Sequence, residues 1–345
     1  MKQYLLPQDG QFYRANLHTH TVMSDGMLTA KEVKALYKSA GYSVLAVTDH
    51  NRLIGYPELC DDDFLMLPGI EYDVIDHSCS QSQKKKVYHI NFYPEDPQNL
   101  AMPCYNPDDV FAAPEVTYPE QAYVGEPNYK RNYEKINELV AEYRKHGFIA
   151  ALNHPTWSLQ TIEDYRKLDL SQFFAMEIYN NASYQTEGHY EINTHLYDKL
   201  LCEGNRIFCT ATDDAHHFKF VMPRPHCSCG GFVMIKAERL DHRTIIEALK
   251  AGSFYASMGP LIEELYIEDN TLSVKTSPAA KIVLSTGYRC TRVVYPASPH
   301  ASVCEATFDL SNIYPGYVRI TVTDARGRMA WSQPYYKTEP IIIKS

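Results

Sequence analysis

The chain has 345 residues, of which 45% are hydrophobic, and its formal net charge at pH 7 is -9. This length allows one barrel-sized domain and a smaller second one, with enough apolar residues for a proper core. The acidic balance argues against a broad basic surface, so we expect neither long nucleic acid nor an anionic membrane as a partner. No apolar stretch approaches the roughly 20 residues that cross a bilayer, and no secretory signal pattern is present, so a cytoplasmic location is expected.

Nine cysteines are scattered along the chain without paired CxxC spacing. This pattern predicts neither a disulfide framework nor a cysteine-rich zinc site. The one close pair, Cys227 and Cys229, is typical of free thiols in a loop.

Strand and helix patterns alternate up to about residue 257. Residues 12–18 form the first expected strand, and the capping-box pair Thr29 and Glu32 starts a helix that ends near Gly41. Further strands are expected at 42–47, 64–67, 87–93, 148–152, 174–178, 206–211 and 231–236, and further helices at 132–146, 188–203 and 241–251. Such alternation predicts a parallel sheet, and seven or eight units predict a closed α/β barrel.

Candidate metal ligands follow these strands. His18 and His20 are two residues apart at a strand end, so both side chains face the same way and can bind one cation. Ligand-type residues recur at or just after later strands, or within one: His50, Glu71, His89, His154, Asp214 and His216. Barrel enzymes place their chemistry at the C-terminal ends of strands, where distant residues converge. The pattern indicates a metal-dependent hydrolase.

The order of these motifs resembles that of the polymerase and histidinol phosphatase (PHP) family of phosphoesterases. The motifs are His18-Thr19-His20 with Ser24-Asp25-Gly26, Thr48-Asp49-His50-Asn51, Gly69-Ile70-Glu71, His89, Asn153-His154-Pro155, Glu177-Ile178-Tyr179-Asn180 and Asp214-Ala215-His216. They cover most of residues 12–257. The resemblance implies a distorted (β/α)7 barrel that holds up to three divalent metal ions.

The resemblance also implies how the ligands are shared among the metals. The first metal would be bound by His18, His20, Glu71 and Asp214, the second by Glu71, His89 and His154, and the third by Asp25, His50 and His216. Histidine with carboxylate suits zinc, manganese or iron alike. The predicted catalytic residues are Asp25, His50 and Asp214, with Asp25 and His50 assisting the leaving group.

A phosphate-holding cation is expected from a loop on the same face. Arg224 is the first candidate, with Lys219 and His217 behind it, because arginine can donate two parallel hydrogen bonds to a phosphate. A surface arginine in a proline-rich loop is the alternative. Three further acids are expected to orient ligands instead of binding metal: Asp49, Glu177 and Asp213.

Residues 94–130 interrupt the alternation with seven prolines and little periodicity. This stretch is too long for an ordinary barrel connection, so we expect a lid or a substrate-selecting wall. A disordered linker is the alternative.

The pattern changes after residue 257, which divides the chain into an expected barrel domain, 1–257, and a second domain, 258–345. Short alternating runs separated by turn residues such as Asp269-Asn270 predict a small antiparallel β-sandwich. It carries no ligand cluster, so a packing or homo-oligomerisation role is expected.

These features predict a phosphoesterase that uses a metal-activated hydroxide. Its expected substrate is a small phosphorylated molecule: a nucleotide, a short oligonucleotide end or a phosphorylated metabolite. Two alternatives stay open, a non-catalytic metal-containing binding protein and a metal-assisted amidohydrolase.

Overall fold

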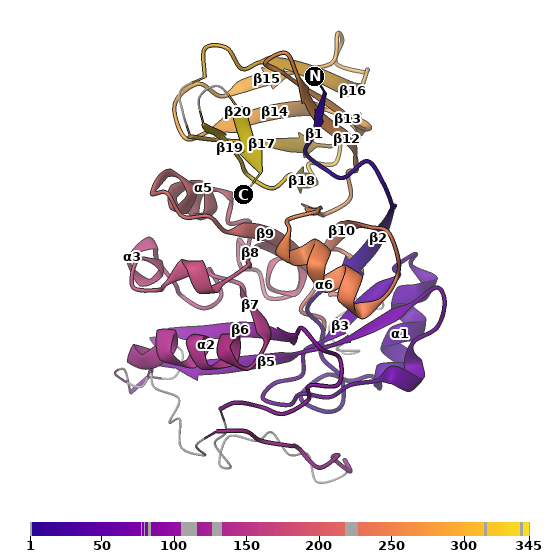
Figure 1. Cartoon of the computed structure of the whole chain (residues 1–345), viewed down its shortest axis with the longest axis vertical. Helices are drawn as coiled ribbons and strands as arrows, with labels where there is room; N and C mark the ends of the chain where they lie inside the picture. The colour runs from indigo at the N-terminus through magenta and orange to yellow at the C-terminus, as the bar shows by residue number, and fades with distance from the viewer. Residues whose placement is uncertain are drawn as a thin grey trace.

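A computed structural model gives the fold and describes residues 2–76, 78, 80–81, 84–104, 116–125, 133–217, 227–313, 316–338 and 341–344. An α/β part lies below a β-domain in Figure 1. The first strand, β1 (Gln3–Tyr4), pairs with β12 (Ile262–Glu268), so the start of the chain lies in the β-domain. No helix among the described residues is long and apolar enough to cross a membrane.

Helix ends follow local capping. α1 (Ala30–Ser39) begins after Thr29, whose hydroxyl accepts the Glu32 N–H at 3.3 Å, while the Glu32 carboxylate accepts the Thr29 N–H at 2.8 Å. Asp241 caps α6 (His242–Lys250) through the N–H of the third helical residue. The remaining helices are α2 (Ile136–Lys145), α3 (Ile162–Tyr165), α4 (Asn181–Gln185), α5 (Thr194–Cys202) and the 3-10 turns η1 (Pro57–Leu59), η4 (Tyr133–Lys135) and η5 (Leu170–Gln172).

The helix expected over 188–203 is shorter than predicted. It begins only at Thr194, because Ile192 forms an antiparallel bridge with Tyr179 and holds the preceding residues extended.

The strands of the α/β part belong to two sheets. One runs in the order β11-β10-β2-β3-β4 and the other in the order β5-β6-β7-β8-β9. The bounds are β2 (Gln11–Asn16), β3 (Val44–Val47), β4 (Leu65–Pro68), β5 (Ile70–Ile75), β6 (Val87–Pro94), β7 (Phe148–Leu152), β8 (Ala175–Asn180), β9 (Phe208–Thr212), β10 (Phe232–Ala237) and β11 (Phe254–Ser257). Most of these strands are apolar and fully buried, which explains their continuous hydrophobic runs.

Strand direction corrects the prediction of an all-parallel sheet. Neighbours are parallel in β2-β3-β4 and β7-β8-β9, but β6 is antiparallel to both β5 and β7, and β10 is antiparallel to both β2 and β11. Residues 76–86 join β5 to β6 and are too few for a crossover helix, so the two strands form a hairpin. Between the described strands no continuous ladder closes the barrel. Isolated parallel bridges join the two sheets instead, Thr19 with Ala215 and His50 with Glu71.

The β-domain is antiparallel, as predicted. Its strands are β12, β13 (Thr271–Ala279), β14 (Lys281–Thr286), β15 (Arg292–Val294), β16 (Val303–Asp309), β17 (Gly316–Thr323), β18 (Met329–Trp331), β19 (Tyr335–Thr338) and β20 (Ile341–Lys344). Sheet β1-β12-β13-β16 packs on β14 and β17 through one apolar core that includes Leu265, Val274 and Ile320. Asp269 and Asn270 have φ of 46° and 61°, which suits the tight turn between β12 and β13.

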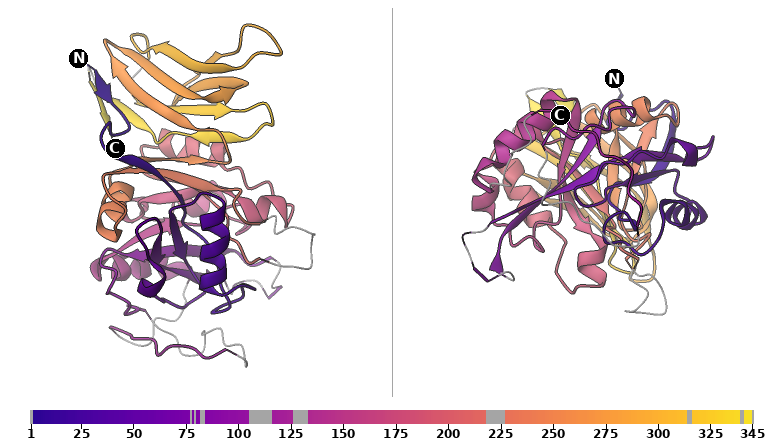
Figure 2. Two further views of the ribbon diagram at one scale, coloured as in Figure 1. Left: turned by 90° about the vertical axis from the view of Figure 1, so that its right-hand side faces the viewer. Right: turned by 90° about the horizontal axis from the view of Figure 1, so that it is seen from below.

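The two parts share a sheet. β11 pairs with β10 on one side and with β18 on the other, so the pairing continues from the α/β part into the β-domain (Figure 2). At the edge of β9, the side-chain amide of Gln333 accepts the Cys209 N–H at 2.8 Å and donates to the Cys209 carbonyl at 3.0 Å. The β-domain therefore satisfies backbone groups of the α/β part.

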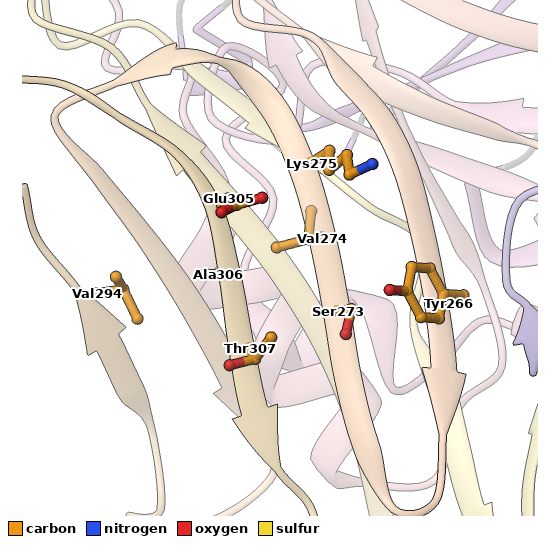
Figure 3. A pocket seen from close by; sticks show the side chains of 8 residues that line it. All are labelled: Tyr266, Ser273, Val274, Lys275, Val294, Glu305, Ala306 and Thr307. Atoms are coloured by element: carbon orange, nitrogen blue, oxygen red, sulfur yellow. The ribbon is translucent and has the colours of Figure 1, made fainter.

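A groove on the β-domain lies beside β12, β13, β15 and β16 (Figure 3). It is lined by Tyr266, Ser273, Val274, Lys275, Val294, Glu305, Ala306 and Thr307. Within the described chain, none of the clusters of candidate metal ligands includes a residue of this groove. The candidate metal-ligand clusters of the described residues all lie in the α/β part.

Candidate metal centre

All nine predicted metal ligands lie in the described chain and belong to one contact network. Three groups of side chains in that chain are close enough together to hold a metal ion: His18, His20, Glu71 and Asp214; His20, Asp25, His50 and His216; and His50, Glu71 and His89. His154 joins this network through Glu71 and Asp214. Most of these residues follow the C-terminal ends of parallel strands, which meet at one edge. Glu71 instead lies at the start of β5, and His89 lies within the antiparallel strand β6.

Glu71, on β5, is the centre of the network. Its side chain is 1% exposed, and its two oxygens face the ring nitrogens of five histidines. Oε1 lies 3.2 Å from His18 Nε2, 3.0 Å from His89 Nδ1 and 3.2 Å from His154 Nε2, and Oε2 lies 3.2 Å from His20 Nε2 and 3.4 Å from His50 Nδ1. A buried carboxylate in this position would be shared between neighbouring metal ions.

Asp214 completes the buried side of the centre. Its Oδ1 lies 3.0 Å from His20 Nε2 and 3.3 Å from His18 Nε2. The backbone of Asp214 has φ of 51°, in the left-handed region that side chains other than glycine rarely adopt. Its N–H donates to the His18 carbonyl at 2.9 Å, so the end of β2 holds this conformation in place.

Asp25 lies on the more open side of the centre, with 35% of its side chain exposed. Its Oδ2 lies 3.2 Å from His216 Nε2 and 3.8 Å from His50 Nε2. His20 lies between the two sides, because its Nε2 faces Glu71 and Asp214 while its Nδ1 is 3.6 Å from Asp25. His50 likewise faces Glu71 with one ring nitrogen and Asp25 with the other. It could therefore be a metal ligand on either the buried or the open side of the centre.

Hydrogen bonds to the second ring nitrogen orient several ligands. Glu177 Oε1 lies 2.7 Å from His18 Nδ1, which leaves Nε2 of that ring to face the centre. His154 Nδ1 is paired with Ser158 Oγ at 3.1 Å, and His216 Nδ1 with the Asp214 carbonyl at 3.0 Å. The expectation that Glu177 orients a ligand agrees with this geometry.

The other two acids expected to orient ligands hold backbone turns. Asp49 accepts the Thr21 N–H at 2.7 Å and the Ser24 hydroxyl at 2.8 Å, which shapes the turn between His20 and Asp25. Asp213 accepts three backbone N–H groups of residues 229–231 and the Tyr37 hydroxyl. Both carboxylates are nearly inaccessible.

Charges inside the centre shift the pKa values of its groups. Burial would raise the pKa of Glu71, but His18, His89 and His50 hold it well below its usual value. Burial would lower the pKa of His20, but Asp214 and Glu71 raise it to about 10, and Glu71 and Asp214 likewise raise that of His154 to about 9. For His50 burial prevails and lowers the pKa to about 4, so this ring is neutral at pH 7 and offers a lone pair.

These shifts predict how the metal-free protein responds to pH. Since the folded pKa of His20 is about 10 against an unfolded value of 6.5, its attraction to the carboxylates stabilises the fold fully below pH 6.5 and is lost as pH rises towards 10. We expect the urea midpoint of chelator-treated protein to fall between pH 7 and pH 9.5. The metal-loaded protein is the control. Its histidines are already deprotonated, so it should show no such fall, and a flat curve for the metal-free protein would contradict the prediction.

Of the three predicted phosphate-binding residues, His217 alone lies in the described part of the chain, and it is not a member of the network. Lys219 and Arg224 lie outside the described residues. His217 is 1% exposed, and its ring nitrogens are paired with Ser228 Oγ at 2.9 Å and Thr19 Oγ1 at 3.4 Å. This geometry does not support a substrate-binding role for His217, because the ring is enclosed and both its nitrogens are engaged.

Part of the 94–130 segment lies beside the centre. The guanidinium of Arg52, two residues after His50, lies 3.6 Å from the ring centre of Tyr118, and the Leu53 N–H donates to Gln121 at 3.0 Å. Figure 1 shows the described pieces of this segment at the end of the molecule farthest from the β-domain. Residues 105–115 and 126–130 of the expected lid lie outside the described residues.

Sequence reasoning missed two amides that contact the ligands. Asn153 donates to Glu71 Oε1 at 2.7 Å, and Asn180 donates to Asp214 Oδ2 at 3.2 Å. Both belong to the motifs that carried the PHP resemblance, and their place beside His154 and after Glu177 was the available signal. They keep the carboxylates oriented.

The donor set fits metal ions. The Nε2 atoms of His18 and His20 lie 3.3 Å apart, and both face the same two carboxylates, as ligands that converge on a cation do. Imidazole nitrogens with carboxylate oxygens suit divalent transition metals. The fold and the site therefore define a mixed α/β protein with a candidate metal centre.

No protein-family model and no curated protein sequence matches the chain. Among solved structures, it is similar to a two-domain protein from Bacteroides vulgatus, described as containing a predicted PHP-like metal-dependent phosphoesterase, with 16% identity, a TM-score of 0.44, and 99% of this chain and 98% of that chain covered.

Two further solved structures each cover about three fifths of the chain. A proposed metal-dependent phosphoesterase from Bifidobacterium adolescentis has 14% identity and a TM-score of 0.36, with 61% of this chain and 89% of that chain covered. An amidohydrolase from Chromobacterium violaceum has 15% identity and a TM-score of 0.35, with 59% and 87% covered. The structural neighbours thus include two proteins described as metal-dependent phosphoesterases, one of them predicted to be PHP-like.

Proposed function

We propose that the chain is a metal-dependent phosphoesterase that hydrolyses a phosphate ester of a small molecule. The observation that carries this proposal is the position of Glu71, whose two buried oxygens face five histidine nitrogens. Shared carboxylates of this kind occur where metal ions lie side by side, an arrangement that phosphatases and nucleases use. The order of the sequence motifs, which resembles that of PHP phosphoesterases, selects phosphate esters as the substrate class.

The position of each residue suggests its role in the proposed reaction. His18, His20, Glu71 and Asp214 would hold one metal, Glu71 with His89 and His154 a second, and Asp25, His50 and His216 a third. Bound divalent ions supply an activated water at neutral pH and neutralise the charge on phosphoryl oxygens. Asp25 and His50 lie on the open side, where a leaving group can reach them, and Glu177 and Asn180 keep the buried ligands fixed.

A small substrate fits this site better than a long polymer. The net charge of -9 disfavours polyanions, and residues 116–125 lie against the segment that follows His50. The 94–130 segment would then act as a wall that selects compact phosphate esters.

The metal content of purified protein tests the centre. We expect about three ions per chain, and about one ion fewer in His50→Ala, with a ten- to hundred-fold lower kcat, because the open side loses a ligand. Elemental analysis measures the ions, and release of inorganic phosphate from a panel of phosphomonoesters measures turnover. His195→Ala is the matched control, because this exposed histidine lies on α5 outside the network.

The outcomes separate the alternatives. Metal-dependent phosphate release supports the proposal. Bound metal without turnover of any ester would favour a binding protein, and cleavage of amides without phosphate release would favour an amidohydrolase. At most one ion, insensitive to His50→Ala, would contradict the shared centre.

A further inference from the structure

An indole ring borders the metal centre on the side of His89 and His154. The ring of Trp157 lies 5.2 Å from the ring of His89 and 4.9 Å from that of His154, measured between ring centres. Trp157 is partly exposed, whereas His154 is 2% exposed. The indole therefore stands between two candidate ligands and solvent.

A buried carboxylate holds the backbone of this loop. Glu191 is fully buried, and its two oxygens accept the Thr156 N–H at 2.9 Å and the Trp157 N–H at 2.8 Å. Asn193 Nδ2 donates to the same carboxylate at 2.7 Å. The buried Glu191 carboxylate accepts the backbone N–H groups of both Thr156 and Trp157. These two hydrogen bonds fix the backbone position of Trp157.

Exposed side chains also occur on the loop that carries Trp157 and on the loop that contacts Thr156. Tyr190 is 69% exposed, and its carbonyl accepts the Thr156 hydroxyl at 3.5 Å, which ties the two loops together. Tyr184 packs 6.0 Å from Tyr190, and Leu159 is 42% exposed with φ of 58°. An aromatic ring such as that of Trp157 at the border of a polar site favours contact with an apolar part of a ligand.

We propose that Trp157 determines substrate specificity by stacking on a planar, aromatic organic group of the phosphate ester. The inference rests on the proposed function, since the metal centre would bind the phosphate next to this ring. A rigid indole offers a large flat surface at low entropic cost and stacks on any planar π-system. Glu191 is a positioning residue, because it acts through the backbone of Trp157.

The kinetic test compares an aromatic with an aliphatic ester. For Trp157→Leu, we expect KM for phenyl phosphate to rise about ten-fold more than KM for glycerol phosphate, because one stacking contact is lost. Trp157→Phe should restore most of this preference. Tyr295→Leu, which replaces a 65% exposed tyrosine of the β-domain, is the control and should leave the ratio unchanged. An equal effect on both esters, or no effect on either, would overturn the inference.

A binding test separates failure of the inference from failure of the proposed function. The chain has two tryptophans, and Trp331 is fully buried, so quenching of fluorescence by a small ligand reports mainly on Trp157. Metal-loaded protein is titrated with phenylphosphonate and with methylphosphonate, and affinities are also measured by calorimetry. Tighter binding of phenylphosphonate that is lost in Trp157→Leu supports the inference. Equal affinities would overturn it and leave the proposed function standing, whereas no binding of either probe would overturn both.

Discussion

Replacing Glu71 by glutamine is expected to remove most of the bound metal and to lower kcat/KM on the order of 1000-fold, about 4 kcal/mol of transition-state stabilisation. The amide keeps the shape of the side chain but loses the negative charge that faces five histidine nitrogens. Its NH2 group would also point a donor at rings that must themselves bind a cation. No other carboxylate of the centre faces as many ligands.

Elemental analysis and phosphate release measure this effect. Glu187→Gln makes the same chemical change at an exposed position and should behave like the unchanged protein. A second comparison is His50→Ala, which we expect to lose about one ion and retain the buried pair. If Glu71→Gln kept both metal and turnover, Glu71 would not be the shared ligand, and the proposed function would lose its main support.

Replacing Trp331 by alanine is expected to lower the free energy of unfolding by about 3–5 kcal/mol. Trp331 is fully buried and belongs to a core that also contains Ile207 and Cys209 of the α/β part. The loss should therefore destabilise both parts, and a single shifted transition is expected in urea unfolding followed by circular dichroism. Tyr295→Ala is the matched control, because this aromatic side chain is 65% exposed.

Two further variants refine this prediction. Within the described chain, the Nε1 donor of Trp331 is buried without a partner, so Trp331→Phe should cost much less than alanine. Gln333→Ala should cost about 1–3 kcal/mol, because the Cys209 N–H and carbonyl lose their partner in a buried site. Two separate transitions, with the metal centre unaffected, would show instead that the β-domain is an independent module.

Local signals in the sequence predicted the secondary structure well. The capping pair Thr29 and Glu32 starts α1, and the pair Asp269 and Asn270 forms the turn between β12 and β13. Such features involve neighbours a few residues apart, so the chain carries them without help from distant contacts. The convergence of most candidate ligands was predictable for a related reason, because strands that run in parallel end at the same edge. Glu71 and His89, on the β5–β6 hairpin, are the exceptions.

Contacts between distant segments could not be predicted in this way. The hairpin of β5 and β6 reverses a strand that the pattern placed in a parallel sheet, because apolar runs look alike in either direction. The enclosure of His217 by Ser228 and Thr19 likewise depends on a distant loop.

Short stretches of the sequence thus determine the strand ends, the helix caps and the types of side chain that can bind a metal. Only the folded protein decides which oxygen of Glu71 faces which histidine. The same holds for the hydrogen bonds by which Glu191 fixes Trp157 and Gln333 pairs with the edge of β9. The physical reason is that these contacts join groups far apart in sequence. Hydrogen bonds and ion pairs act over a few ångströms, so their partners are set by the packing of whole sheets.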